Sequence, residues 1–215
     1  IKMVIEMEKI EYEKSESLIE DINENMEYYE IKLKKYQDIQ ELINAQKMEF
    51  HNCKFIKCKF ENSNFENTYF KNVEFEECDL SNSKFNKTCL NNTNFSNCKM
   101  VGCDFSESDL MNIKIKETIM QYGNFTEANF KNVIIEDSNI SSGSLSEVKF
   151  KNVNFKNTDF SNSQFFRTKL TGIDFSESNI SGIVVGLEDL KGAIVNELQA
   201  LELANLLGIK IKKSY

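Results

Sequence analysis

Large apolar residues recur at every fifth position through most of this 215-residue chain. From Phe50 to Ile180, each position divisible by five holds Phe, Leu, Ile or Met, and no insertion or deletion breaks the register. An α-helix repeats near 3.6 residues and a strand repeats every two, so neither element alone explains a period of five. The pattern therefore indicates a repeat architecture, in which one short unit is copied along the chain.

A second regularity surrounds each large residue. Small or β-branched residues such as Cys53, Ser63 and Val73 lie two places before it, and a spacing of two puts both side chains on one face of a short extended segment. Asparagines such as Asn62 and Asn72 recur two places after it, where they suit a turn. Each unit is thus predicted to be a short strand with two inward side chains followed by a corner, and stacked units make a solenoid.

These units resemble the pentapeptide-repeat family, whose unit is a small residue, Asp or Asn, Leu or Phe, and two polar residues. The stretches TNFSN, CDFSE, ANFKN and TDFSN carry that pattern. The resemblance implies an all-β solenoid, a right-handed quadrilateral β-helix with twenty residues per coil. Sorting the large residues by twenty gives one column rich in Phe and one poor in it, which supports four sides. About seven coils at about 4.8 Å each would make a rod on the order of 33 Å long.

The segments that flank the repeats are expected to cap its two open ends. Residues 1–47 predict a helical N-terminal extension or cap, because apolar residues recur there at helical spacing, although the first dozen residues alternate enough for a strand. Residues 48–190 form the predicted β-helix. Residues 191–215 predict a helix with Asn196 as its N-cap and Gly208 just past its end, followed by a short strand.

The C-terminal helix is apolar on more than one side and therefore has to be covered twice. One side is expected to cap the last coil and the other to meet a second copy of the chain; capping alone is the alternative. The candidate dimer interface consists of Leu198, Leu201, Leu203, Leu206, Leu207, Ile209 and Ile211.

Composition and charge exclude several classes of protein. The net charge of −8 argues against direct nucleic-acid binding. The sequence has no apolar run long enough to cross a membrane and no signal-peptide pattern at its start, so a cytoplasmic location is expected.

Residues able to carry out catalysis or bind metal are scarce. Five of the six cysteines occupy the small inward position and are expected to be reduced and buried, whereas Cys89 lies in an outward position and is the thiol expected to react. The single histidine, His51, has no catalytic partner at a recognisable spacing and is expected to be a surface residue. We therefore expect no catalytic site, no metal site and no cofactor, and a protein that is not an enzyme.

The stretch LKGAIVNELQALELANLLGIKI resembles the end of the MfpA and Qnr-type pentapeptide proteins. The resemblance implies a tail-to-tail homodimer that mimics duplex DNA, binds DNA gyrase or topoisomerase IV, and modulates fluoroquinolone sensitivity. Two features depart from those proteins: the unbroken register leaves no room for projecting loops, and the segment before Phe50 is not their usual start.

Charge provides a separate test of DNA mimicry. Residues 48–190 carry 20 acidic and 15 basic side chains, which does not support mimicry along the whole rod. The charges do segregate into an acidic side, centred on positions 55, 75, 115, 135, 155 and 175, and a basic side, centred on positions 70, 130, 150 and 170. The alternative is that these are ordinary solubilising charges. The candidate partner-binding residues of the acidic side are Glu74, Glu76, Glu77, Glu117, Glu136, Asp137, Asp174 and Glu177.

Apolar residues in outward positions favour a third interpretation. Val101, Ile119 and Tyr122 belong to one side of neighbouring coils and are predicted to form a small apolar patch. Exposed apolar patches often mark a surface that binds another protein. The alternative function is therefore a structural or protein-protein interaction scaffold whose partner is unknown.

Overall fold

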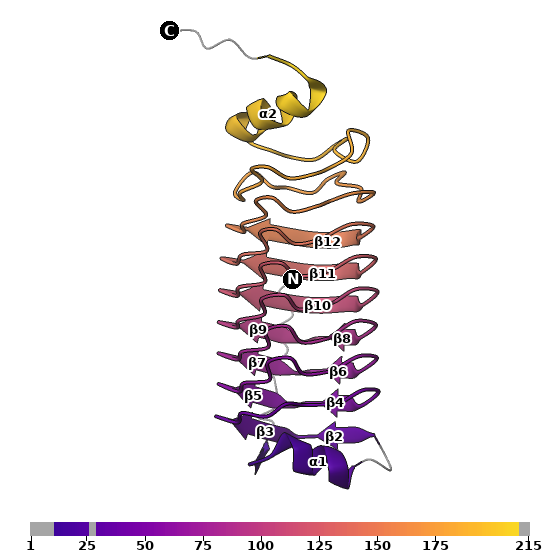
Figure 1. Ribbon diagram of the computed structural model, residues 1–215, viewed down its shortest axis with the longest axis vertical. Coiled ribbons are helices and arrows are strands. Elements are labelled where there is room, and N and C mark those ends of the chain that lie inside the picture. The colour runs from indigo at the N-terminus through magenta and orange to yellow at the C-terminus, as the bar shows by residue number, and fades with distance from the viewer. Residues whose placement is uncertain (1–10, 26–28, 211–215) are drawn as a thin grey trace, which may run out of the picture.

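The computed structural model describes residues 11–25 and 29–210, which form a rod of stacked coils with a helix at each end (Figure 1). No helix in those two ranges is long and apolar enough to cross a membrane. The helices are α1 (Leu18–Glu24) and α2 (Glu197–Ala204), with a 3₁₀ turn at Asn205–Leu207. The strands are β1 (Glu13–Ser15), β2 (Glu30–Lys32), β3 (Lys34–Gln37), β4 (Glu49–His51), β5 (Lys54–Ile56), β6 (Tyr69–Lys71), β7 (Glu74–Glu76), β8 (Cys89–Asn91), β9 (Asn94–Ser96), β10 (Asp109–Lys116), β11 (Asn129–Glu136) and β12 (Lys149–Lys156).

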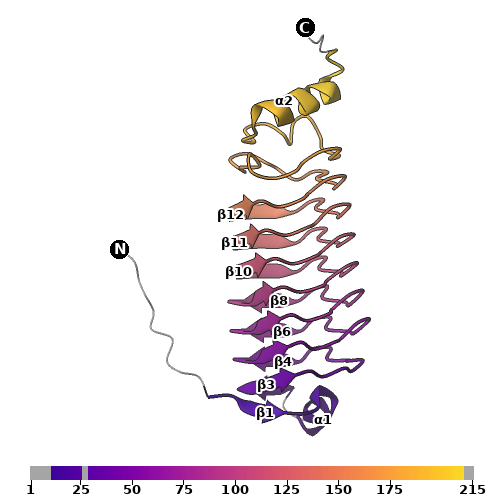
Figure 2. The ribbon, with the colours of Figure 1, turned by 90° about the vertical axis from the view of Figure 1, so that its left-hand side faces the viewer.

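Each coil pairs in parallel with the next coil along the rod, twenty residues further on. Phe50 lies opposite Phe70, and Phe55 opposite Phe75. Strands occupy the acidic and basic sides of the rod. On the other two sides, successive coils are joined by isolated β-bridges. We call these the third side, centred on positions 60, 80 and so on, and the fourth side, centred on positions 65, 85 and so on. A view turned by 90° shows the coils following one another along the long axis (Figure 2). The predicted four-sided solenoid is confirmed.

The corners explain why asparagine recurs. The residue two places after almost every large residue has a positive φ, for example 60° at Asn62 and 54° at Asn72, a region that Asn tolerates better than most residues; Glu177 is an exception. The Asn side chains also bond to one another between coils: Asn72 Nδ2 donates to Asn52 Oδ1 at 2.8 Å, and Asn92 Nδ2 to Asn72 Oδ1 at 2.7 Å. Asparagine therefore both permits the turn and ties successive turns together.

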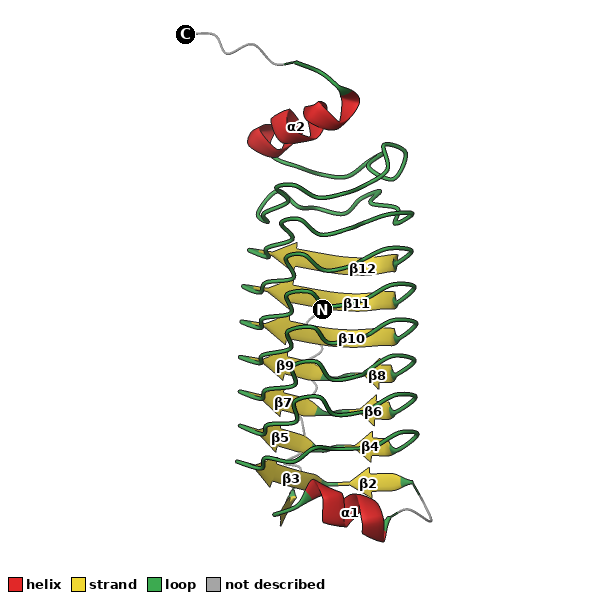
Figure 3. Cartoon of the chain, viewed as in Figure 1, coloured by secondary structure: helices red, strands yellow, loops and turns green. Residues whose placement is uncertain are grey.

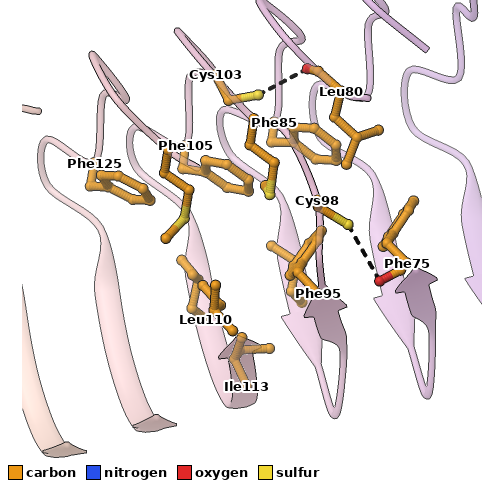
Figure 4. Close-up of a cluster of buried hydrophobic side chains, with 14 of the residues drawn as sticks. Phe75, Leu80, Phe85, Phe95, Cys98, Cys103, Phe105, Leu110, Ile113 and Phe125 are labelled. Carbon is orange, nitrogen blue, oxygen red and sulfur yellow. Dashed lines mark hydrogen bonds between the residues drawn. The ribbon is translucent and has the colours of Figure 1, made fainter. Parts of the chain in front are cut away.

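Stacked rings and small polar groups fill the interior of the rod. The Phe105 ring stacks between Phe85 and Phe125, with centroid separations of 4.8 and 5.4 Å (Figure 4). The small inward residues also bond across coils, since Cys103 Sγ donates to the Leu80 carbonyl at 3.0 Å. The core is thus one continuous column in which each layer contacts only its neighbours.

The solenoid begins earlier than the predicted boundary at residue 48. Ile31 pairs with Phe50 and Tyr36 with Phe55, only 19 residues further on, because the first coil lacks one corner residue. This shift removes its large residues from the five-residue register. Among the described residues before 48, only α1 is α-helical. It confirms the predicted helical cap, but the helix is far shorter than residues 1–47, because β2 and β3 of the first coil occupy part of that segment. The strand predicted in the first dozen residues falls mostly outside the described ranges.

Helix α1 covers the open end of this first coil. Glu41 takes the place that Phe60 holds one coil later, and its carboxylate accepts hydrogen bonds from the Leu18 and Ile19 amides at 2.9 and 3.0 Å. Leu18 and Ile22 of α1 are buried against the last layer of the core, which would otherwise be exposed to solvent. A carboxylate at a helix N-terminus satisfies amides that have no partner inside the helix. Glu41 therefore ends the apolar column and also anchors the helix that covers it.

The C-terminal end is closed differently from the prediction. The coils continue to Ile194, which bridges to Asp174, although no strand follows β12 among the described residues (Figure 3). Helix α2 begins at the predicted N-cap, but a polar side chain, Gln199, is the one it buries. Gln199 Nε2 donates to the carbonyls of Phe175 and Ser178 at 2.8 and 2.6 Å.

The predicted C-terminal strand is not formed at residues 209–210, and residues 211–215 lie outside the described range. Gly208 has a φ of 71°, as expected for the residue that ends the helix.

Replacing Glu41 with Ala should loosen α1 while leaving the coils intact. The carboxylate accepts three hydrogen bonds, from the Ser17 hydroxyl and from the Leu18 and Ile19 amides, and their loss predicts a local destabilisation of about 1–3 kcal/mol. Amide hydrogen exchange, followed by NMR, should become faster at Leu18 and Ile19. Glu61→Ala, which removes an exposed carboxylate from the next coil, is the control and should leave this exchange unchanged. Unchanged exchange in Glu41→Ala would mean that the carboxylate does not anchor the helix.

Candidate protein-binding surface

Most carboxylates of the acidic side are neutralised by lysines of that same side. Lys54 lies 2.9 Å from Glu74 and 3.3 Å from Glu76, and its hydrogen bond with Glu74 raises the pKa of the Lys54 ammonium. Glu77, Glu117 and Glu136 are paired as well, with Lys57, Lys116 and Lys114 respectively. Five of the eight predicted residues are therefore held in ion pairs, and the N-terminal half of this side carries little net charge.

Four carboxylates nearer the C-terminus are free of ion pairs within the described ranges, and we call them the C-terminal carboxylates: Asp137, Asp159, Asp174 and Glu177. Three of them are among the predicted residues. Asp159 was missed because its register assigns it to the third side, whereas the corner between the two sides brings it to the same groove as Asp137. Lys156 is the one lysine of the acidic side within this stretch.

Hydrogen bonds hold three of these carboxylates in place, and two of the three are bonded from the neighbouring coil. Asn157 Nδ2 donates to Asp137 at 2.8 Å, and Asn179 Nδ2 donates to Asp159 at 3.0 Å. Bonds from the hydroxyl and the backbone amide of Ser176 hold the pKa of the Asp174 carboxyl below its ordinary value. These hydrogen bonds orient Asp137, Asp159 and Asp174 without a cation.

A shallow groove of about 430 Å³ runs along the corner between the acidic and third sides, and we call it the corner groove. Glu117, Asp137 and Asp159 line it together with Ile119. Ile119 is 44% exposed and Tyr122, on the same coil, is 65% exposed. The predicted apolar patch thus continues directly into the carboxylates, and Val101 completes it as a half-buried member on the preceding coil.

The C-terminal end of the rod exposes a second apolar surface. Of the predicted dimer residues, Leu198, Leu201, Leu206 and Ile209 are exposed and Leu203 is half-buried. The Leu207 side chain and all of Ile211 lie outside what the structure describes. Between α2 and the last coil lies a groove of about 540 Å³, which we call the terminal groove; its lining residues are Leu187, Glu188, Leu190, Lys191, Ala193, Val195, Ala200, Leu203 and Ala204.

The cysteines behave as buried apolar residues. Cys53, Cys58, Cys78, Cys98 and Cys103 are buried, and Cys89 is half-buried, so the predicted burial is confirmed. Burial raises the pKa of the Cys53 thiol to about 11 and that of the Cys103 thiol to about 12. Burial and the nearby Asp109 raise the pKa of Cys89 as well. With their pKa raised, the thiols of Cys53, Cys89 and Cys103 are protonated near neutral pH, whereas a hydrogen bond with the Cys78 thiol lowers the pKa of the Cys98 thiol.

Comparison with known families identifies the repeats. A family profile described as "Pentapeptide repeat region" matches residues 48–125, and one described as "Pentapeptide repeats (8 copies)" matches residues 144–182. The chain belongs to the pentapeptide-repeat family. A search of curated protein sequences found no significant match.

Several solved structures are similar to this pentapeptide-repeat protein. A trypsin-treated form of QnrB1, described as a plasmid-mediated fluoroquinolone resistance protein, is 19% identical, with 86% of this chain and 99% of QnrB1 covered and a TM-score of 0.31. Full-length QnrB1 is 17% identical over 82% of this chain and 100% of the other, with a TM-score of 0.27. HetL, a pentapeptide-repeat protein involved in heterocyst differentiation regulation in the cyanobacterium Nostoc sp. strain PCC 7120, is 11% identical over 78% of this chain and 90% of its own, with a TM-score of 0.29.

The buried thiols predict a loss of stability in alkaline solution. Cys53 and Cys103 keep their protons in the folded state above the ordinary thiol pKa of 9.0, whereas the unfolded chain releases them. Their contribution to the free energy of unfolding is therefore intact below about pH 9 and falls as the pH rises towards 11–12. Denaturant midpoints measured from pH 8 to pH 11 should fall less steeply in Cys103→Ala, relative to its own value at pH 8, than in the native protein. Parallel pH profiles for the two proteins would contradict this assignment.

Proposed function

We propose that this pentapeptide-repeat protein is not an enzyme and acts by binding another protein along its C-terminal half. The observation that carries this proposal is the corner groove, where carboxylates without ion pairs adjoin the exposed Ile119; Tyr122, on the same coil as Ile119, is exposed as well. A partner that fits this surface presents basic side chains beside an apolar one. Such contacts steer association through charge and gain affinity from the apolar area.

The partner class that we favour is a type II topoisomerase, DNA gyrase or topoisomerase IV, with the rod occupying part of its DNA-binding surface. Four carboxylates without ion pairs lie within three coils, about 14 Å of the rod. Duplex DNA of that length carries about eight charges, so this stretch reaches about half the density of DNA. The neutralised N-terminal half does not resemble DNA in charge. DNA mimicry, and with it any effect on fluoroquinolone sensitivity, is therefore proposed for the C-terminal half alone.

A second candidate is an interaction scaffold for a different protein. The apolar patch favours it, because a surface that only imitates DNA has no need of exposed Ile119 and Tyr122. In that case the carboxylates would provide orientation while the patch provides affinity.

We also propose that a second copy of the chain covers the C-terminal end. Seven large apolar residues are exposed between residue 184 and residue 209: Val184, Leu187, Ile194, Leu198, Leu201, Leu206 and Ile209. Both signs of charge accompany them, with Glu197 and Glu202 on α2 and Lys191 beside the terminal groove, so a two-fold contact can match unlike charges. Two rods joined in this way would place their C-terminal carboxylates on either side of the junction.

A gyrase supercoiling assay, with and without a fluoroquinolone, tests the partner class. The native protein should inhibit supercoiling or protect the enzyme from the drug at micromolar concentrations. The quadruple variant Asp137→Asn, Asp159→Asn, Asp174→Asn and Glu177→Gln should lose most of this effect, because it removes the carboxylates and keeps their hydrogen-bonding shape.

The matched control is Glu74→Gln, Glu76→Gln and Glu77→Gln, which removes carboxylates that are already in ion pairs and should leave the effect nearly unchanged. Absence of any effect of the native protein would reject the topoisomerase as partner. An effect that survives in the quadruple variant would reject the C-terminal carboxylates as its site.

Sedimentation equilibrium tests the dimer. Leu198→Asp with Leu201→Asp should convert a dimer into a monomer, because each buried carboxylate would be left without a partner. Leu42→Asp, which changes a 69% exposed leucine near the opposite end, should have no effect on the mass. A native protein that stays monomeric at tens of micromolar would contradict the dimer.

A further inference from the structure

The first two coils bring the single histidine together with two carboxylates. Glu49 and His51 project from β4, and Glu30 lies opposite Glu49 on the neighbouring strand β2. His51 Nε2 is 3.0 Å from Glu49 Oε2 and 3.4 Å from Glu30 Oε1, and all three atoms lie within 4.8 Å of one another. We propose that Glu30, Glu49 and His51 bind a divalent transition-metal ion such as Zn²⁺.

The spacing of the three atoms fits such an ion. Bonds of about 2.1 Å from a tetrahedral zinc ion to nitrogen or oxygen place neighbouring ligand atoms about 3.4 Å apart. The two distances from His51 Nε2 lie close to that value, so small side-chain rotations suffice. Three protein ligands leave one position for water. One imidazole with two carboxylates suits a transition-metal ion better than Mg²⁺ or Ca²⁺, which prefer oxygen ligands alone.

Charge at the cluster also favours a cation. A neutral imidazole carries one N–H in all, on Nδ1 or on Nε2, and here Nε2 faces two carboxylates. Lys32 lies 2.8 Å from Glu30 Oε2, so it holds the far oxygen of Glu30 and leaves Oε1 directed at His51. A metal ion would replace the one shared proton and bind both carboxylates.

The surroundings restrict how the histidine can move. The Tyr69 ring packs edge-on against the imidazole with centroids 5.5 Å apart, and the His51 side chain is only 17% exposed. The Glu49 side chain is 52% exposed, which leaves an entry path from solvent. Ligands that are already oriented lose less freedom when a metal binds.

The expectation of no metal site rested on spacing along the chain. Glu30 was not included, because the first coil is one residue short and the twenty-residue register does not pair residue 30 with residue 49. A metal at this place would fasten β2 to β4 and hence the first coil to the rest of the rod. It would do so whether or not the partner proposed above is correct.

Because the chain has one histidine, NMR can test the site directly. The full chain carrying Cys89→Ser, which removes the half-buried thiol as a competing ligand, is titrated with ZnCl₂. The imidazole proton resonances of His51 should shift with saturation at one Zn²⁺ per chain and a Kd in the micromolar range. The melting temperature should rise in parallel, because the ion binds the folded state.

Glu30→Gln keeps the shape of the side chain and should weaken binding at least about tenfold. Glu61→Gln removes an exposed carboxylate from another side and should leave binding unchanged. Imidazole resonances that do not move with Zn²⁺ would overturn the proposal, as would equal affinity in Glu30→Gln. Neither outcome depends on whether a His51 variant folds.

Discussion

The parallel hydrogen bonding between successive coils is the interaction on which this structure depends. It puts equivalent side chains about 4.8 Å apart, so that identical residues stack on themselves along the rod. The same geometry stacks phenylalanines inside, as at Phe65, Phe85 and Phe105, and asparagines at the corners, as at Asn52 and Asn72. Each coil is stabilised by its two neighbours and by little else.

An architecture of this kind has an unavoidable problem at each end, where a layer of core and a row of carbonyls would face water. The chain solves it with polar groups as much as with apolar ones. Glu41 anchors α1 by accepting hydrogen bonds from the backbone amides at the start of that helix. Gln199 of α2 donates to the carbonyls of Phe175 and Ser178. Hydrophobic coverage explains α1 well, since Leu18 and Ile22 are buried, but it explains α2 poorly. Leu198 and Leu201 of α2 remain exposed and Leu203 is only half-buried, because the side-chain amide of Gln199 satisfies the carbonyls of the last coil.

This distinction also explains what the sequence could predict. The five-residue register identifies a solenoid of stacked repeats, because the core depends only on residue type at fixed intervals. Its four sides were implied by the resemblance to the pentapeptide-repeat family and supported by sorting the large residues by twenty. The first coil escaped detection because one missing corner residue moves Ile31 and Tyr36 out of register, although both pair normally with the next coil. The burial of Gln199 could not be predicted, because a helical pattern indicates a buried face by its apolar residues. A glutamine that is buried because it donates to two carbonyls does not contribute to such a pattern.

The candidate surface was predictable only in part, for a related reason. The register assigns each charge to a side, but it does not tell whether a carboxylate reaches a lysine on the neighbouring coil, as Glu74 reaches Lys54. The register also assigns residues on either side of a corner to different sides of the rod, whereas Asp137 and Asp159 line the same groove although a corner separates them.

Interior coils of a regular solenoid are nearly interchangeable, so a partner that distinguishes this rod has to recognise the places where the pattern changes. Those places are few among the described residues: the metal-binding cluster proposed on the first two coils, the corner where ion pairs give way to free carboxylates beside Ile119, and the apolar C-terminal end. The last two lie on the same half of the rod. If two chains join at α2, both copies of the corner surface come to the centre of the assembly, while the first coils lie at its outer ends. Binding would then be concentrated at the middle of the dimer, and the outer coils would serve mainly to stabilise it.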